Sequence, residues 1–199
     1  MKLKTILLLL TLLLNMVSVK VMAYDALVDG IYYNFSGTSA EVTYLYNYRS
    51  NYNAYKGHVI IPENITYRGK QYSVKSIGSD AFEYCSDLTS ITIPSSVASI
   101  GEYAFYECTG LASAIIGNSV TTIGNSAFQG CESLKQIVLP NSLTKINMSL
   151  FENCTDLESV TIPETVETIE NFAFYDCRSL KKLYIPASVN KNWSNCSIT

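Results

Sequence analysis

Apolar positions recur with a fixed period of 23 residues over residues 77–191. Each copy follows the pattern I-G-x-x-A-F-x-x-C-x-x-L-x-x-I-x-I-P, and the copies begin at Ile77, Ile100, Ile123, Ile146 and Ile169. A period of this size is typical of a solenoid, in which each repeat forms one coil. One coil cannot bury its own apolar side, so the pattern predicts five coils stacked around a continuous core.

The end of each copy predicts a short strand. The spacing L-x-x-I-x-I changes to a period of two, which places the aliphatic side chains of one strand face in the core. Proline has no N–H for a ladder, so the strands end at Pro94, Pro140, Pro163 and Pro186, and at Gly117 in the one departure. The five strands are expected to form one parallel sheet along the stack.

The same alternation predicts which strand residues face solvent. The first outward column is Ser90, Ser113, Gln136, Ser159 and Lys182, and the second is Thr92, Ile115, Val138, Thr161 and Tyr184. Three residues of the second column are apolar although they fill no core, which favours a contact surface rimmed by polar groups. The alternative is that β-branched residues simply suit exposed strand positions.

The segment from Ser79 to Cys85 and its equivalents predict a short helix or 3₁₀ turn, because a small residue precedes Phe82 in a compact segment. Five of the six cysteines share the 23-residue period, at Cys85, Cys108, Cys131, Cys154 and Cys177. Six cysteines in a secreted chain are consistent with disulfides, and stacked neighbours would be close enough to form them. An odd column cannot pair fully within itself, so we expect these thiols to be reduced and packed as small hydrophobes. Cys196 lies outside the column, as an exposed thiol or an intermolecular partner.

The two ends of the chain do not follow the repeat. Residues 1–23 combine Lys2 and Lys4 with the apolar run Ile6–Leu14 and a small residue at Ala23, which predicts a cleavable signal peptide. The run is well short of about 18 residues, so no membrane span is expected after cleavage. Residues 24–76 alternate β-branched and aromatic residues around glycines and predict a β-rich N-terminal cap that adds a first coil. Residues 192–199 form a C-terminal tail.

The net charge of the chain argues against a nucleic-acid partner. The chain has 14 basic and 17 acidic residues, and without the three lysines of residues 1–23 the net charge changes from −3 to −6. An acidic chain lacks the basic stripe that a nucleic-acid partner requires. Ten of the fifteen tyrosines lie between Tyr24 and Tyr72, and the polar-aromatic stretch Tyr44–Tyr55 is either a ligand-facing loop or an exposed hairpin of the cap.

No residues of the sequence assemble a catalytic site. The single histidine, His58, has no second histidine or Ser/Cys motif to form a triad, so we expect a surface or cap residue. The sequence has no C-x-x-C pair, and no metal site or cofactor is expected. These observations predict a protein that is not an enzyme.

The repeat phrase resembles the BspA-like leucine-rich repeat family of bacterial surface proteins in all five copies. The segments DGIYY, EVTY and VIIP are similar to the region that often precedes such repeats. The resemblance implies an α/β-type leucine-rich repeat solenoid, secreted or displayed on the cell surface, that binds proteins in adhesion to a host or to other bacteria. Two hypotheses follow: a binding module for a protein, or a structural spacer related to a longer adhesin. Glycan binding through the Tyr-rich region is a more distant alternative.

Overall fold

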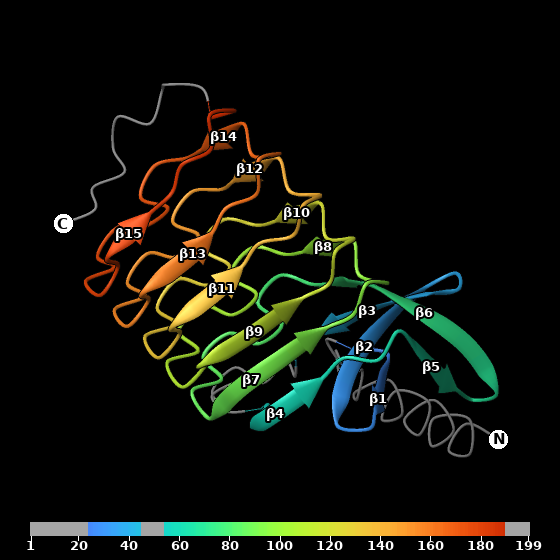
Figure 1. Cartoon of the computed structure of the whole chain (residues 1–199). Coiled ribbons are helices and arrows are strands. Elements are labelled where there is room, and N and C mark those ends of the chain that lie inside the picture. The colour runs from blue at the N-terminus through green and yellow to red at the C-terminus, as the bar shows by residue number, and fades with distance from the viewer. Residues whose placement is uncertain (1–23, 45–53, 190–199) are drawn as a thin grey trace, which may run out of the picture.

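The computed structural model describes residues 24–44 and 54–189, without the side chain of Lys182. The predicted signal peptide, the C-terminal tail with Cys196 and most of the Tyr44–Tyr55 stretch lie outside the described residues. Coils stack side by side and present two rows of parallel strands, with the cap at one end of the stack (Figure 1). This arrangement confirms the solenoid that the 23-residue period predicts.

The longer strands form one surface of the stack, which we call the strand face (Figure 1). Its strands are β4 (Gly57–Ile60), β7 (Leu88–Ile93), β9 (Ser113–Ile116), β11 (Gln136–Val138), β13 (Ser159–Thr161) and β15 (Lys182–Leu183). They pair in parallel as two sheets, β4-β7-β9 and β11-β13-β15, so the single continuous sheet expected from the sequence is wrong.

The division between the two sheets falls beside the coil that departs from the template. Ala114 of β9 replaces a larger aliphatic residue, and Gly117 replaces proline. A Cβ at Gly117 would lie 2.5 Å from the carbonyl oxygen of Pro94, so the second coil approaches the first more closely here than a side chain allows. The template departures therefore coincide with the break in the ladder.

The second row of strands is shorter. It contains β8 (Ser99–Ile100), β10 (Thr122–Ile123), β12 (Lys145–Ile146) and β14 (Thr168–Ile169). β8 pairs in parallel with β6 (Lys70–Ile77), which joins this row to the cap. The cap also contains β1 (Ala26–Val28), β2 (Ile31–Ser36), β3 (Ser39–Thr43) and β5 (Asn64–Tyr67), while β4 pairs with β7. The cap thus extends both rows, as a cap that adds a first coil should.

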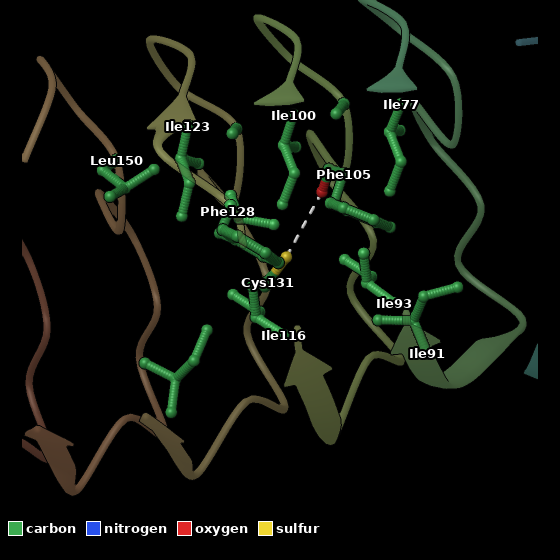
Figure 2. Packing of buried hydrophobic residues seen from close by; sticks show 14 of the residues in the cluster. Ile77, Ile91, Ile93, Ile100, Phe105, Ile116, Ile123, Phe128, Cys131 and Leu150 are labelled. Carbon is green, nitrogen blue, oxygen red and sulfur yellow. Dashed lines mark hydrogen bonds between the residues drawn. The ribbon is translucent and has the colours of Figure 1, made fainter. Parts of the chain in front are cut away.

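A ladder of phenylalanine rings forms the centre of the core. Neighbouring rings stack with centroids 4.9 Å apart between Phe82 and Phe105 and 5.0 Å apart between Phe105 and Phe128. The side chains of Ile77, Ile100 and Ile123 enter the core from the second row, and those of Ile91, Ile93 and Ile116 enter from the strand face (Figure 2). Tyr55 of the cap closes the ladder, with its ring centroid 4.4 Å from that of Phe82.

The third side of each coil consists of turns, and we call it the turn face. It contains residues 79–84, 102–107, 125–130, 148–153 and 171–176. The short helix or 3₁₀ turn expected over Ser79–Cys85 is wrong, and so is the α part of the α/β class: the described residues contain turns here and no helix.

Hydrogen bonds between coils explain the absence of a helix on the turn face. The N–H groups of Asp80, Phe82 and Tyr84 donate to carbonyl oxygens of the next coil at 3.0, 2.8 and 2.8 Å. Two residues in each coil adopt a left-handed backbone, which turns alternate N–H groups along the stack. The first left-handed column is Asp80, Tyr103, Ser126, Ser149 and Phe172, and the second is Tyr84, Glu107, Gly130, Asn153 and Asp176.

The five cysteines of the column are buried and free of disulfides, which confirms the expected reduced column in the described part of the chain. Their role is more specific than hydrophobic packing. The Cys131 thiol donates to the carbonyl oxygen of Phe105 in the preceding coil at 3.2 Å (Figure 2). The thiols of Cys108, Cys154 and Cys177 each donate in the same way to the phenylalanine carbonyl of the coil before. Burial raises the pKa of the Cys131 and Cys154 thiols well above the usual value, so they remain protonated donors.

Candidate functional site

The strand face places the predicted outward residues at the surface. In β7, Ile91 and Ile93 are buried whereas Ser90 and Thr92 are partly exposed, as the alternation requires. The same order continues in the following coils, where the exposed residues are Ser113, Ile115, Gln136, Val138, Ser159, Thr161 and Tyr184. Lys182 lies in β15 opposite Ser159, although its side chain is outside the described atoms. The two columns are therefore real features of the surface.

Within each of the two sheets, strand register places neighbouring members of a column opposite one another. Thr92 is opposite Ile115, and Val138 is opposite Thr161, in parallel pairs. Neighbouring strands of such a pair lie about 4.8 Å apart, close enough for side chains of one column to touch a common partner. Ile115 and Val138 belong to β9 and β11 and flank the break between the two sheets.

Sequence reasoning missed two residues of this surface. β4 pairs with β7 so that His58 is opposite Ser90 and Ile60 is opposite Thr92. Both His58 and Ile60 are exposed, and His58 Nδ1 lies 2.5 Å from Ser90 Oγ. The signal was present in Val59-Ile60-Ile61-Pro62, which ends as the repeat strands do, but the position of β4 beside β7 is a tertiary fact.

With Ile60 included, the second column becomes a largely apolar row, which we call the outer stripe: Ile60, Thr92, Ile115, Val138, Thr161 and Tyr184. The side chains of Ile60 and Ile115 are each 60% exposed, that of Val138 66% and that of Tyr184 68%. No other side of the described molecule carries apolar side chains of this size at such exposure. The outer stripe is therefore its most prominent apolar surface.

Ion pairs lie where the chain enters the strands. Lys56 Nζ is 3.0 Å from Asp87 Oδ2, and Lys181 Nζ is 3.0 Å from Glu158 Oε2. The hydrogen bond and charge of Lys181 hold the pKa of Glu158 below its usual value. Each pair joins neighbouring coils but is exposed, so it contributes little to stability and leaves a charged rim beside the outer stripe.

The Tyr-rich region contributes a core residue where the sequence allowed a ligand-facing one. Tyr55 is only 3% exposed, and its hydroxyl donates to the Thr43 carbonyl at 2.7 Å while accepting from the Tyr32 N–H at 3.1 Å. Burial raises the pKa of Tyr55 far above its usual value, and that of Tyr33 likewise. Tyr55 therefore fixes the cap to the Phe ladder, and residues 45–53 of the stretch lie outside the described residues.

The described residues contain no cluster of three or more His, Cys, Asp or Glu side chains placed to hold a metal ion. His58 lies at the surface of β4, beside a serine. Within residues 24–44 and 54–189, no helix is long and apolar enough to cross a membrane.

Comparison with solved structures gives bacterial leucine-rich repeat proteins. A leucine-rich repeat protein of T. pallidum is 31% identical, with a TM-score of 0.66 over 77% of this chain and 67% of that chain. A leucine-rich cell surface protein from Faecalibacterium prausnitzii is 28% identical, with a TM-score of 0.58 over 81% of this chain and 48% of that one. The pneumococcal vaccine antigen PcpA is 25% identical, with a TM-score of 0.57 over 72% of this chain and 40% of that one. This chain thus spans about half or less of the last two.

A comparison with curated proteins finds none that matches this chain. The family model described as BspA type leucine rich repeat region matches residues 75–198 with six copies. The template counted five copies, so the number of coils stays a prediction. The match covers more than half of the chain and agrees with the parallel strand rows, the buried Phe and Leu columns and the structural relatives. The chain therefore belongs to the BspA-type leucine-rich repeat family.

Proposed function

We propose that this chain is a secreted or surface-displayed, non-enzymatic binding module that recognises a protein through its strand face. The observation that carries the proposal is the outer stripe, whose large apolar side chains are 60–68% exposed and of which Ile60 and Ile115 are aligned through β7 by strand register. Nothing in the fold requires apolar side chains there, because alternation has already directed the core residues inward. Water contact at these side chains is unfavourable, and a partner that covers them removes it.

The surroundings of the outer stripe suit a protein partner. The first column supplies Ser113, Gln136 and Ser159 as hydrogen-bonding groups along one side, and the Lys181–Glu158 pair lies at the rim. Interfaces between proteins commonly have an apolar centre with such a polar rim. Fully covering a Val, Ile or similar side chain contributes about 1.5–3 kcal/mol, so three or four of them can anchor a partner.

The proposed location rests on two observations. The basic, apolar and small-residue order of residues 1–23 is typical of an export signal. The related protein from Faecalibacterium prausnitzii is described as a cell surface protein, and the T. pallidum relative is likewise a leucine-rich repeat protein of a bacterium. Repeat solenoids of this family generally act as binding modules without catalysis, which supports the non-enzymatic assignment.

The test compares a double variant of the strand face with a control substitution off that face. The full chain is immobilised, host-matrix and bacterial surface extracts are passed over it, and the retained protein is quantified for Val138→Glu combined with Tyr184→Ala. We expect retention to fall about tenfold, because a charge now enters the apolar centre of the interface. Thr144→Glu, an exposed residue after Pro140 and off the strand face, is the matched control and should leave retention unchanged.

Melting temperatures measured on the same variants separate binding from folding. Both glutamates are exposed, so the melting temperature should change by no more than about 2 °C. Equal retention by the strand-face variant and the control would place the site elsewhere. If the unmodified chain retains nothing specific, the spacer hypothesis replaces the binding one.

A further inference from the structure

The turn face of the first two coils contains a second surface, separate from the outer stripe. A hollow of about 570 Å³ lies between the two coils, and its walls include the rings of Tyr84, Tyr103 and Tyr106 and the carboxylates of Asp80, Glu83 and Glu102. We call it the tyrosine hollow. Its residues come from neighbouring coils, so the stacking of the solenoid is what creates it.

The ring of Tyr106 stands nearly at right angles to the rings of Tyr84 and Tyr103. The centroids of Tyr84 and Tyr106 are 5.4 Å apart with an interplanar angle of 88°, and those of Tyr103 and Tyr106 are 5.6 Å apart at 81°. Tyr103 is 41% exposed. Rings in this arrangement present faces in more than one direction, and an aromatic face attracts a cation placed within about 6 Å of its centroid.

The backbone at Tyr84 and Tyr103 has a conformation that costs free energy for a residue with a bulky side chain. Tyr84 and Tyr103 both occupy left-handed positions, with φ of 57° and 54°. Glycine and asparagine tolerate this conformation, as at Gly130 and Asn153, and the last coil has a second ring there, Phe172. A bulky ring in the left-handed region is a rare choice that fills no core here, and such outliers concentrate at functional sites.

The carboxylates of the hollow have no basic partner among the described residues, although the neutral Asn125 amide donates to Glu102 Oε1 at 3.2 Å. None of the four ion pairs of the described chain involves Asp80, Glu83 or Glu102. Desolvation and the neighbouring carboxylate of Glu102 raise the pKa of Asp80, and desolvation and Asp80 raise that of Glu83. The carboxylates thus repel one another in a partly covered site, which a cation would relieve.

The last coil provides an internal comparison. Phe172 and Tyr175 occupy the columns of Tyr103 and Tyr106, with ring centroids 5.8 Å apart at 86°. The same coil contains an arginine, Arg178, which donates two hydrogen bonds of 2.8 Å to the Asp176 carboxylate. The coil with this aromatic pair thus has an arginine paired with a carboxylate, whereas no described ion pair gives the carboxylates of the tyrosine hollow a basic partner.

We propose that the tyrosine hollow binds an arginine side chain from a basic segment of a protein partner. The guanidinium would lie against the tyrosine rings while its N–H groups donate to the carboxylates of Asp80, Glu83 or Glu102. Arginine fits better than lysine because its planar, delocalised cation both stacks on rings and donates to two oxygens at once. This site uses a different side of the coil from the outer stripe and does not depend on it.

The test measures binding of a short fluorescent peptide with one central arginine to the full chain. An identical peptide with citrulline, a neutral group of the same shape, is the matched probe. We expect the arginine peptide to bind about tenfold more tightly than the citrulline peptide, with the difference shrinking as salt is raised from 50 to 500 mM. Equal binding of the two peptides, or no binding of the arginine peptide, overturns the proposal.

Variants of the hollow test whether the peptide binds there. Glu83→Gln with Glu102→Gln, and separately Tyr106→Leu, should each weaken the arginine peptide about fivefold or more. Phe172→Leu, the same kind of change in the last coil, should have no effect. Circular dichroism checks folding, and the Glu→Gln pair keeps the test decisive if Tyr106→Leu fails to fold. Binding that survives the hollow variants but is lost in Val138→Glu would assign the peptide to the strand face and overturn the proposal.

Discussion

The strand face and the turn face are two sides of the same coils, yet they constrain sequence in different ways. On the strand face the backbone is extended, so an outward position such as Val138 accepts almost any side chain. On the turn face two positions per coil are left-handed, a conformation that glycine and asparagine, as at Gly130 and Asn153, adopt at lower cost than bulky residues. An apolar residue on the strand face is consequently weaker evidence of function than a tyrosine at a left-handed position. The strand face gains its weight from four large, exposed side chains in one repeat column, of which Ile60 and Ile115 are aligned through β7.

The largest expected difference in stability is between substitutions in the core, which both faces share, and substitutions on either surface. Phe128→Ala should lower the free energy of unfolding by about 3–5 kcal/mol, because the ring is fully buried and stacks on both neighbours. Val138→Ala should lower it by no more than about 0.5 kcal/mol, since that side chain is exposed. Urea titration followed by circular dichroism measures both. Similar losses for the two variants would contradict the assignment of Val138 to a free surface.

The second largest effect on stability is expected in the cysteine column, where it tests whether the thiol acts as a hydrogen-bond donor or only fills space. Cys131→Ala should cost about 1–3 kcal/mol, because it leaves a small cavity and removes the donor to the Phe105 carbonyl. Ser159→Ala on the strand face is the exposed control, with a change near zero. In the native chain the five column thiols should resist alkylation because all are buried, and burial raises the pKa of Cys177 to about 12 and those of Cys108, Cys131 and Cys154 well above normal. Recovery of these cysteines as disulfides from the unreduced, unfolded chain would refute the thiol column.

Glycine substitutions should have opposite signs on the two faces. Asn153→Gly places glycine at φ 60°, a conformation that costs it nothing, and should be neutral or raise stability by about 0.5 kcal/mol. Thr161→Gly in β13 should lower stability by about 1 kcal/mol, because glycine loses more freedom in an extended strand. Thermal unfolding of the two variants provides the comparison. Destabilisation by both would mean that backbone conformation is not what distinguishes the faces.

The smallest expected effect is the electrostatic contribution of Asp80 and Glu83, on the turn face, to the stability of the fold. The pKa values of Asp80 and Glu83 are raised in the folded chain, so ionisation of these groups destabilises it, and the loss is present at neutral pH. The loss disappears as pH falls below the ordinary values of 3.8 and 4.5. Asp80→Asn with Glu83→Gln should therefore raise stability at pH 7 by about 0.5 kcal/mol, solvent screening included, and by nothing near pH 3. A variant that is less stable at pH 7 would show that the carboxylates make favourable contacts.

Several features of the fold and the candidate site followed from particular residues. The Phe82 and Leu88 columns predicted the core, and alternation around Ile91 correctly placed Ser90 and Thr92 outward. Ile60 could not be placed because its column membership depends on the pairing of β4 with β7, which no periodicity reports. The turn face was misread as helical because a compact segment around Phe82 has the composition of a helical turn, whereas its N–H groups bond across coils.

The sequence by itself determined the period, the buried columns and the direction of each strand side chain, because these depend on local alternation and on apolar residues seeking the core. Only the tertiary structure decided the left-handed turns, the break between β9 and β11 and the gathering of Tyr84 with Tyr103 and Tyr106. Each of these depends on contacts between residues about one repeat apart in the chain. Hydrogen bonds such as that from Phe82 N–H to the Ala104 carbonyl form only once coils are stacked, and they override the local preference of the segment.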